Sequence, residues 1–329
     1  MERRVLGRTG LELSVLGLGG LFLSEVGDND SAGAHRVIEH AVGRGVNFID
    51  TAPTYADSEE VLGRAFAEIE TPLYLSTKLG GRPSPFDAKD VGALRRSLET
   101  SLELLGRDAV DILFVHEPDR PGHFDWWDDP DRYEGPVNEL LDELKAEGLI
   151  RFTGLAGTTA YELAKGVATG RYDVVLTAYN YSLLWTEAAL AVLPEARRLG
   201  VGVIAGSPLQ QGSLAKRYDD QIAAGAPWLS PPRRDQFRAL YALLDDLEMS
   251  LPELALRFVV SSPAVDVVLT GARSVEEVDA NIDTIERGPL PADVLERLAA
   301  IQAMVPFRPL EEPLALPFER AYRGPGAGR

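Results

Sequence analysis

The chain has 329 residues, of which 45% are hydrophobic and 26% are charged, and this composition excludes a wholly disordered protein. The net charge of −18 repels phosphate backbones and anionic lipids, so we expect neither nucleic acid nor a membrane surface as a partner. The absence of cysteine excludes disulfides, thiolate catalysis and cysteine-bound metals.

The start of the chain, Met1-Glu2-Arg3-Arg4, leads into no apolar signal core, and no run reaches the roughly 18 apolar residues of a membrane span. We therefore expect a cytoplasmic protein whose partner is a small molecule, and the sequence leaves the oligomeric state open. The length fits either one barrel of about 250 residues or more, or two smaller domains of about 150 residues each.

The first predicted element is a β-hairpin over residues 3–13, because two short runs flank Thr9-Gly10. In a barrel, this hairpin would close the amino-terminal end. Eight apolar runs follow and predict strands: Val15–Leu18, Val46–Ile49, Leu73–Ser76, Val110–Val115, Ile150–Leu155, Val174–Ala178, Gly202–Ala205 and Val265–Leu269. These runs are continuous rather than alternating, which is typical of parallel strands covered by helices.

Amphipathic stretches between the apolar runs predict helices. The clearest of them covers residues 90–105 and ends at Gly106, a residue type that favours the end of a helix. Another is expected to begin at Asp57-x-x-Glu60, which resembles a capping box. Each predicted strand is therefore followed by a predicted helix.

This alternation favours one (β/α)8 barrel, an α/β TIM barrel, over about residues 15–285. With the hairpin before it and a C-terminal helix and tail at about 291–329, it makes a single domain spanning 1–329, and we expect the end of the tail to be disordered. A doubly wound open sheet is the alternative. Against it, the first turn, Gly17-Leu18-Gly19-Gly20, lacks the Gly-x-Gly-x-x-Gly spacing of a dinucleotide-binding turn.

Ionisable residues follow three neighbouring strands, at the barrel end where active sites are built. Asp50 ends the second run, Lys78 the third and His116 the fourth, and Tyr55 lies in the loop after Asp50. Each residue alone is more often structural, but four proton-handling groups on successive strand ends favour function. One histidine with scattered carboxylates is too few for a metal site, so we expect none.

The chemistry of these four side chains suits proton transfer to an alkoxide as a hydride reaches carbon. Asp50 and Lys78 can neutralise each other, since unpaired charges in a barrel mouth are costly. An ammonium beside Tyr55 would lower the pKa of the phenol from its usual value of about 10 and make it a proton donor nearer neutral pH. His116 could donate a hydrogen bond to a carbonyl oxygen.

The sequence resembles the aldo-keto reductases over about residues 3–305. The most specific matching stretch is Gly45-Val-Asn-Phe-Ile-Asp-Thr-Ala-Pro-Thr-Tyr55, with Ser58-Glu-Glu-Val-Leu-Gly63 after it. Weaker matches are Leu75–Lys78, Asp111–Asp119, Ser207–Leu209 and Gly271–Ser274 with Asn281. The opening Leu6-Gly-Arg-Thr-Gly10 is similar to the branch that includes bacterial aldose and sugar dehydrogenases.

The resemblance implies a barrel that binds NADP or NAD, with neither dinucleotide favoured, and a catalytic tetrad. Tyr55 would be the general acid in reduction and the base in oxidation, Lys78 would tune it, Asp50 would hold Lys78, and His116 would orient the carbonyl. The pyrophosphate would bind at the loop carrying Ser207, Leu209, Gly212 and Leu214, and the adenosine end at Gly271, Arg273, Ser274, Glu277 and Asn281. Arg273 could pair with a 2′-phosphate.

Glu277 stands where members that prefer NADPH often carry arginine. A carboxylate there would repel a 2′-phosphate or accept hydrogen bonds from a ribose hydroxyl. The alternative interpretation is a solvated ion pair between Arg273 and Glu277 at the start of a helix.

The nicotinamide end departs from the family pattern. Ala156 and Gly157 stand where members usually have Ser-Asn, and Leu176 where they have glutamine. Gly206 stands where they have an aromatic ring that stacks on nicotinamide. Thr158, Thr159 or Asn180 could supply replacement hydrogen bonds, and Tyr179 could approach the ring.

The loop over about residues 117–135 contains Trp126 and Trp127, which could form the walls of a pocket for a sugar or an aromatic carbonyl. Local packing of a long loop is the alternative. The sequence thus predicts an NAD(P)-dependent reductase or dehydrogenase that interconverts an aldehyde, ketone or aldose with an alcohol. A second hypothesis is a catalytically weak or inactive regulatory barrel that binds the cofactor. A third hypothesis, a metal-dependent hydrolase or isomerase, has little support from the residues.

Overall fold

A closed barrel of parallel strands forms the centre of the protein in a computed structural model that describes residues 1–82, 86–120, 125–225 and 229–308. The barrel strands are β3 (Leu16–Gly19), β4 (Phe48–Asp50), β5 (Tyr74–Leu79), β6 (Val110–His116), β7 (Ile150–Gly157), β8 (Val174–Ala178), β9 (Gly202–Gly206) and β10 (Val267–Gly271). They pair in chain order, and β10 closes the ring on β3. The predicted (β/α)8 barrel is confirmed, and the open sheet is excluded.

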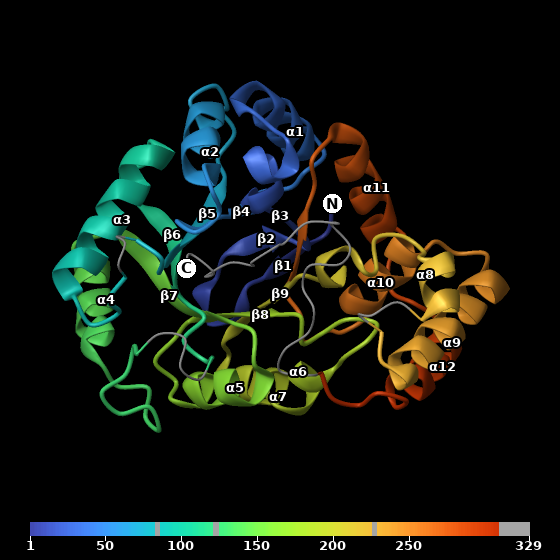
Figure 1. The fold of residues 1–329 in the computed structure, drawn as a ribbon. Helices are drawn as coiled ribbons and strands as arrows, with labels where there is room; N and C mark the ends of the chain where they lie inside the picture. Colours follow the sequence, from blue (N-terminus) through green and yellow to red (C-terminus); the bar gives the residue numbers. More distant parts are fainter. Residues whose placement is uncertain (83–85, 121–124, 226–228, 309–329) are drawn as a thin grey trace.

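Helices surround the barrel on all sides (Figure 1). They are α1 (Ser31–Gly43), α2 (Ser58–Phe66), α3 (Val91–Leu105), α4 (Pro136–Ala146), α5 (Ala160–Ala168), α6 (Glu187–Leu190), α7 (Val192–Leu199), α8 (Asp219–Ala224), α9 (Pro231–Leu247), α10 (Leu251–Val260), α11 (Val275–Glu286) and α12 (Ala292–Gln302). Within the described ranges, none of them is long and apolar enough to cross a membrane. The predicted C-terminal helix is α12, and residues 309–329 of the tail lie outside the described residues.

The starts of α3 and α2 differ in whether the residue that the sequence predicts as the cap forms the capping hydrogen bond. The Asp90 side chain accepts from the N–H of Ala93 at 2.8 Å, and the predicted helix runs from there to Gly106 in the left-handed conformation. The capping box predicted at Asp57 is wrong. Helix α2 begins where expected, but the Asp57 carboxylate instead accepts from the N–H of Glu25 at 2.9 Å, because a distant loop reaches it.

The amino-terminal hairpin closes one end of the barrel, as predicted. Its strands are β1 (Arg3–Val5) and β2 (Glu12–Ser14), joined by a short 3-10 helix over Gly7–Thr9 rather than by a tight turn at Thr9-Gly10. Leu6 and its neighbours pack into the barrel interior, and a side chain at Gly202 would come within 2.6 Å of Leu6. Glycine is therefore required at the bottom of β9.

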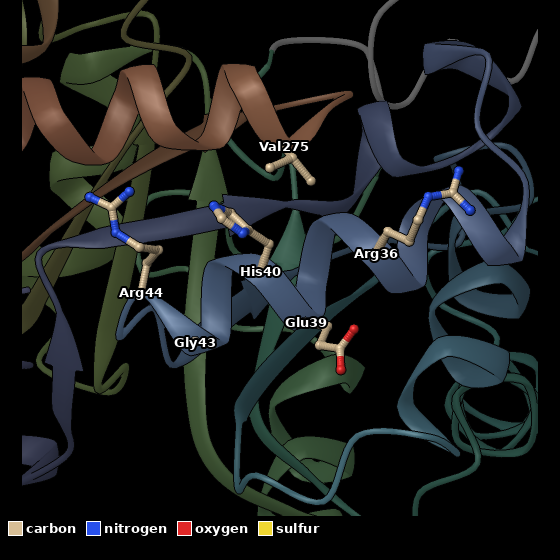
Figure 2. A pocket seen from close by; sticks show the side chains of 6 residues that line it. All are labelled: Arg36, Glu39, His40, Gly43, Arg44 and Val275. Carbon is tan, nitrogen blue, oxygen red and sulfur yellow. The ribbon is translucent and has the colours of Figure 1, made fainter.

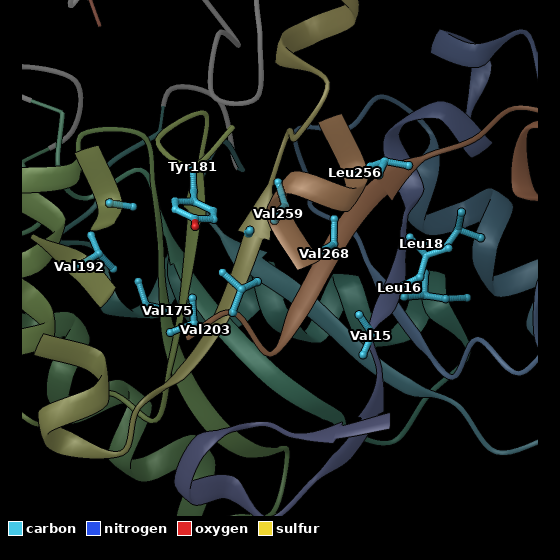
Figure 3. Close-up of a cluster of buried hydrophobic side chains, with 14 of the residues drawn as sticks. Val15, Leu16, Leu18, Val175, Tyr181, Val192, Val203, Leu256, Val259 and Val268 are labelled. Atoms are coloured by element: carbon cyan, nitrogen blue, oxygen red, sulfur yellow. The ribbon is translucent and has the colours of Figure 1, made fainter. Parts of the chain in front are cut away.

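Side chains alternate between two separate cores. Inside the barrel, the hairpin leucines meet inward-facing residues of the strands: Leu6, Leu11, Leu13, Phe48, Ile112, Phe114, Ala156, Val174, Leu176, Ile204, Val267 and Leu269. The intervening residues, such as Leu16, Val175 and Val268, face outward and pack against the helices (Figure 3). Apolar residues on both faces explain why the strand runs are continuous.

Candidate active site

Strand alternation places three ionisable side chains inside the carboxyl end of the barrel. Phe48 faces the interior, so Asp50, two residues later, faces it too. The same period carries β6 from Phe114 to His116, and Lys78 is paired with Phe114 across the sheet. On β4, β5 and β6, an ionisable side chain stands at the last inward position, where loops from the carboxyl end can reach it.

Asp50 and Lys78 form a buried ion pair, with each side chain only 1% exposed. The Lys78 ammonium donates to Asp50 Oδ2 at 2.6 Å and to the Thr51 carbonyl at 2.7 Å. The Ser76 hydroxyl donates to the other oxygen, Asp50 Oδ1, at 2.7 Å. Burial lowers the pKa of the Lys78 ammonium, and the charges of Asp50 and Glu59 oppose this. Asp50 thus compensates a cation that would otherwise be costly to bury.

Tyr55 lies against this pair and against His116. The Lys78 ammonium nitrogen is 4.7 Å from the centroid of the Tyr55 ring. The rings of Tyr55 and His116 meet edge to face with centroids 6.0 Å apart. The Tyr55 side chain is half-buried, while His116 is only 4% exposed. The structure therefore brings together all four residues that the sequence singles out for proton transfer.

Short backbone turns hold the Tyr55 loop over the barrel. The N–H of Tyr55 donates to the Ala52 carbonyl at 3.0 Å, and the Tyr55 carbonyl accepts from the N–H of Ser58 at the start of α2. The Ser58 and Thr51 hydroxyls are 2.8 Å apart, which ties the two ends of the loop together. Tyr55 is thus fixed between β4 and α2 by contacts on both sides.

Two glycines after β5 allow this assembly, and the sequence analysis missed them. A side chain at Gly81 would lie 2.2 Å from Thr54, next to Tyr55, and one at Gly80 would lie 3.1 Å from His116. Both have positive φ, 143° for Gly80 and 77° for Gly81. The signal that could have identified them is the Gly-Gly pair directly after the lysine strand.

Two more buried carboxylates follow His116. Burial raises the pKa of Glu117 to about 7, and Arg120, whose guanidinium is 3.6 Å away, opposes the rise. Asp119 Oδ2 accepts from the N–H groups of Thr158 and Thr159 at 2.8 and 2.6 Å. A side chain at Gly157 would come within 2.5 Å of the Asp119 carboxyl group. Asp119 therefore fills the space beside Gly157 and explains why glycine stands there.

The loop after β9 is a compact turn that contains several left-handed residues. Leu209 has φ −92° and ψ 12°, and Gln210 after it has φ 48°. The change from Leu209 to Gln210 turns the chain sharply, and the N–H of Gln210 donates back to the Ser207 carbonyl at 3.0 Å. Ser207 also has positive φ, and Gly212 and Leu214 complete the turn through N–H bonds to the Leu209 carbonyl. These internal hydrogen bonds give one defined shape to the loop that the resemblance assigns to the pyrophosphate.

The residues expected at the adenosine end gather where β10 leads into α11. Arg273 donates to Glu277 Oε1 at 2.8 Å through its guanidinium and to Oε2 at 2.9 Å through its backbone N–H. The Ser274 hydroxyl caps α11 by accepting from the N–H of Glu277. Asn281 donates to Thr270, and Gly271 packs against Phe22. Arg273 and Glu277 thus form the ion pair that the sequence offered as an alternative, with Arg273 56% exposed on its side chain.

At the nicotinamide end, the mouth of the barrel is apolar. Leu176 and Ala156 belong to the interior core, and a side chain at Gly206 would meet Leu176 at 3.0 Å. Asn180 is fully buried and donates to the Thr177 hydroxyl, and its Oδ1 has no hydrogen-bond partner among the described residues. Apolar packing thus occupies the positions that the resemblance assigns to the nicotinamide.

Trp126 and Trp127 are buried in the outer core rather than arranged around the tetrad. Trp126 is 0% exposed and lies beside Phe86, with ring centroids 5.5 Å apart. Trp127 packs on Tyr133 at 4.9 Å and donates to the Pro118 carbonyl. These contacts favour the local-packing alternative for this loop over a pocket wall.

A surface pocket of about 490 Å³ lies between α1 and the start of α11, away from the tetrad (Figure 2). Two of its lining side chains bond to α11, since His40 contacts Asp279 at 2.7 Å and Arg44 bonds both Asp279 and Asp283. This network joins α1 to α11. Over the residues that the structure describes, no group of three or more His, Asp or Glu side chains could hold a metal.

Comparisons with known proteins identify the family of the chain. The model of the Aldo/keto reductase family matches residues 15–303. L-galactose dehydrogenase of Arabidopsis thaliana is 30% identical over 298 residues, which cover 87% of this chain and 88% of that protein. D-threo-aldose 1-dehydrogenase of a Pseudomonas species is 27% identical, with 83% and 90% covered. A solved aldo-keto reductase from Bacillus halodurans, in its holo form, shares the fold with a TM-score of 0.75 at 24% identity, covering 93% of this chain and 98% of its own.

Proposed function

Because the chain belongs to the aldo/keto reductase family and is therefore an NAD(P)-dependent oxidoreductase, we propose that it interconverts a carbonyl compound and an alcohol with Tyr55 as general acid and base. The observation that carries this proposal is the contact of Tyr55 with both Lys78 and His116 at the carboxyl end of the barrel. The dinucleotide supplies the hydride in reduction and takes it up in oxidation.

Each residue of the tetrad has one task in the proposed reaction. In reduction, Tyr55 gives its phenolic proton to the oxygen of the substrate, and the neighbouring ammonium of Lys78 stabilises the phenolate that remains. His116 donates a hydrogen bond to the same oxygen and orients the carbonyl. Asp50 keeps Lys78 charged and in place at 2.6 Å. In oxidation, the Tyr55 phenolate takes the proton back.

We propose an aldose or a similar hydroxylated carbonyl compound as the substrate. Two relatives that align along most of the chain are named for the oxidation of such sugars. The acidic chain as a whole disfavours anionic substrates.

The test is a paired titration of NADH and NADPH by fluorescence, followed by a turnover screen of aldehydes, ketones and aldoses. We expect at least one dinucleotide to bind and at least one substrate to turn over. Tight binding of dinucleotide with no turnover on any compound would favour the regulatory barrel instead. The apolar replacements at Ala156, Leu176 and Gly206 are the observation behind that second candidate.

We further propose that Glu277 sets the choice between the two dinucleotides, because it already holds the Arg273 guanidinium that a 2′-phosphate would need. Glu277→Arg is expected to raise affinity for NADPH relative to NADH by about tenfold, since charge-assisted hydrogen bonds to a phosphate replace a repulsion. Fluorescence titration of both dinucleotides measures the ratio. Glu276→Arg, on the next residue of α11, is the matched control for net charge. An unchanged ratio in the Glu277 variant would remove Glu277 from dinucleotide selection.

A further inference from the structure

Glu59, the second residue of α2, is a buried carboxylate that lies behind the strand carrying Lys78. Its side chain is only 2% exposed. The Thr77 hydroxyl donates to Glu59 Oε1 at 2.7 Å, and the Arg82 guanidinium donates to Oε2 at 2.7 Å. Thr77 and Lys78 are neighbours on β5 and point to opposite faces of the sheet, so Glu59 lies outside the barrel while Lys78 lies inside it. The proposed proton transfer does not use this carboxylate.

Arg82 connects the buried carboxylate to the Gly80–Gly81 turn, which it follows directly in the chain. The two glycines of this turn leave room for His116 and for Thr54. One side of the turn is held by β5, and the other side is held by the ion pair between Arg82 and Glu59. The turn therefore cannot move away from His116 and Thr54 without breaking that ion pair.

Two chain segments of equal length link the ion pair to the tetrad. Glu59 lies four residues after Tyr55, and Arg82 lies four residues after Lys78. Together with the 2.7 Å ion pair, these segments form a closed loop in which the Lys78 ammonium nitrogen is 4.7 Å from the centroid of the Tyr55 ring. A change at the ion pair is therefore transmitted to the contact between Tyr55 and Lys78.

A buried ion pair adds little stability, because the cost of desolvating two charges offsets most of the attraction between them. Its charge-assisted hydrogen bonds do fix one geometry, since they are short and directional. Glu59 also acts on Lys78 through its charge, which opposes the lowering of the Lys78 pKa by burial. The pair can thus affect the tetrad in two ways, by position and by charge.

We propose that Glu59 and Arg82 are positioning residues that hold the Gly80–Gly81 turn against the Tyr55 loop and thereby set the contact between Tyr55 and Lys78. This inference rests on the proposed function. The pair acts on the reaction through the geometry of the tetrad. Without the pair, the ammonium stabilises the Tyr55 phenolate less, so the phenol keeps its proton to a higher pH.

Arg82→Met is expected to lower kcat for reduction by about 10- to 100-fold, because small displacements of reacting groups are costly. Affinity for the dinucleotide should stay within about twofold. Reduction needs a protonated Tyr55, so kcat falls as the pH rises, and the midpoint of this fall should rise by at least about 0.5 pH unit in the variant. Arg82→Lys keeps a cation and should recover most of the turnover. Arg95→Met is the matched control and should change neither kcat nor the midpoint, since Arg95 is 28% exposed and pairs with Glu147 at 2.7 Å.

The double variant Glu59→Gln/Arg82→Met distinguishes position from charge. It leaves no buried charge unpaired, so it also serves if Arg82→Met alone does not fold. If the pair positions the tetrad, the double variant should keep the lower kcat and the raised midpoint. Return of both values to those of wild type would overturn the inference, because the unpaired charge of Glu59 would then explain the whole effect.

Steady-state kinetics across pH gives kcat and its midpoint, fluorescence titration gives the dinucleotide affinity, and thermal melting checks that each variant is folded. Wild-type kinetics in Arg82→Met would overturn the inference. A lower kcat with an unshifted midpoint would overturn it too, because a general loss of structure has that effect. If the wild type turns over no compound in the substrate screen, the proposed function itself fails, which is a separate result.

Discussion

Tyr55→Phe is expected to reduce turnover by about 10²- to 10⁴-fold while leaving affinity for the dinucleotide within about threefold of wild type. The substitution removes only the hydroxyl that gives the proton, and it keeps the ring that packs on Lys78 at 4.7 Å and on His116. Packing in the mouth is therefore preserved. Steady-state kinetics on a substrate found in the screen gives the turnover, and fluorescence titration gives the affinity.

The control for Tyr55→Phe is Tyr161→Phe, which removes an exposed hydroxyl from the surface of α5 and should change neither quantity. Turnover of the Tyr55 variant close to that of wild type would exclude Tyr55 as the proton donor. A large loss of dinucleotide affinity would instead show that Tyr55 acts in binding. The two measurements together separate a chemical role from a structural one.

Lys78→Met should cost about 3–5 kcal/mol of unfolding free energy in addition to most of the turnover. Removing the ammonium leaves the Asp50 carboxylate buried and unpaired, and an uncompensated buried charge is strongly destabilising. The loss of turnover follows from the missing cation beside Tyr55. Denaturant unfolding measures the free energy, and steady-state kinetics measures the turnover.

The double variant Asp50→Asn/Lys78→Met separates these two effects. It removes both charges, so it should recover much of the lost stability, because a neutral pair of similar volume has no ionic group to desolvate. It should not recover turnover, since the cation beside Tyr55 is still absent. Recovery of both properties would mean that the ion pair acts on turnover only through stability. Recovery of neither would mean that Asp50 does not compensate Lys78.

The sequence predicts the structure correctly where the signal lies in neighbouring residues, as it does for the barrel strands. Continuous apolar runs predicted the barrel strands, and the structure confirms them within a few residues at each end. The position of Asp50, Lys78 and His116 directly after three of these runs predicted that they would lie at one end of the barrel. The capping box predicted at Asp57 is wrong because a tertiary contact overrides the local signal. The Asp57 carboxylate accepts from the N–H of Glu25, in a loop distant in the sequence.

Other features depended on contacts that no local pattern contains. The sequence suggested Trp126 and Trp127 as possible pocket walls, but both are buried against neighbouring helices and loops. From the sequence, Arg273 could bind a 2′-phosphate or form an ion pair with Glu277. In the structure, the start of α11 places the two side chains in an ion pair.

By itself, the sequence determined the (β/α)8 barrel and the identity of the residues at its carboxyl end, because apolar runs alternate with amphipathic stretches and Asp50, Lys78 and His116 directly follow three of those runs. Only the tertiary structure decided how those residues meet. Parallel pairing of β4 with β5 sets the 2.6 Å pair of Asp50 and Lys78, and Gly81, with its positive φ, makes room for the Tyr55 loop at Thr54. The hydroxyl of Tyr179, a left-handed residue after β8, is bonded to Gln211 in the loop after β9. Such contacts depend on where loops from different strands arrive in space, and a linear pattern does not contain that information.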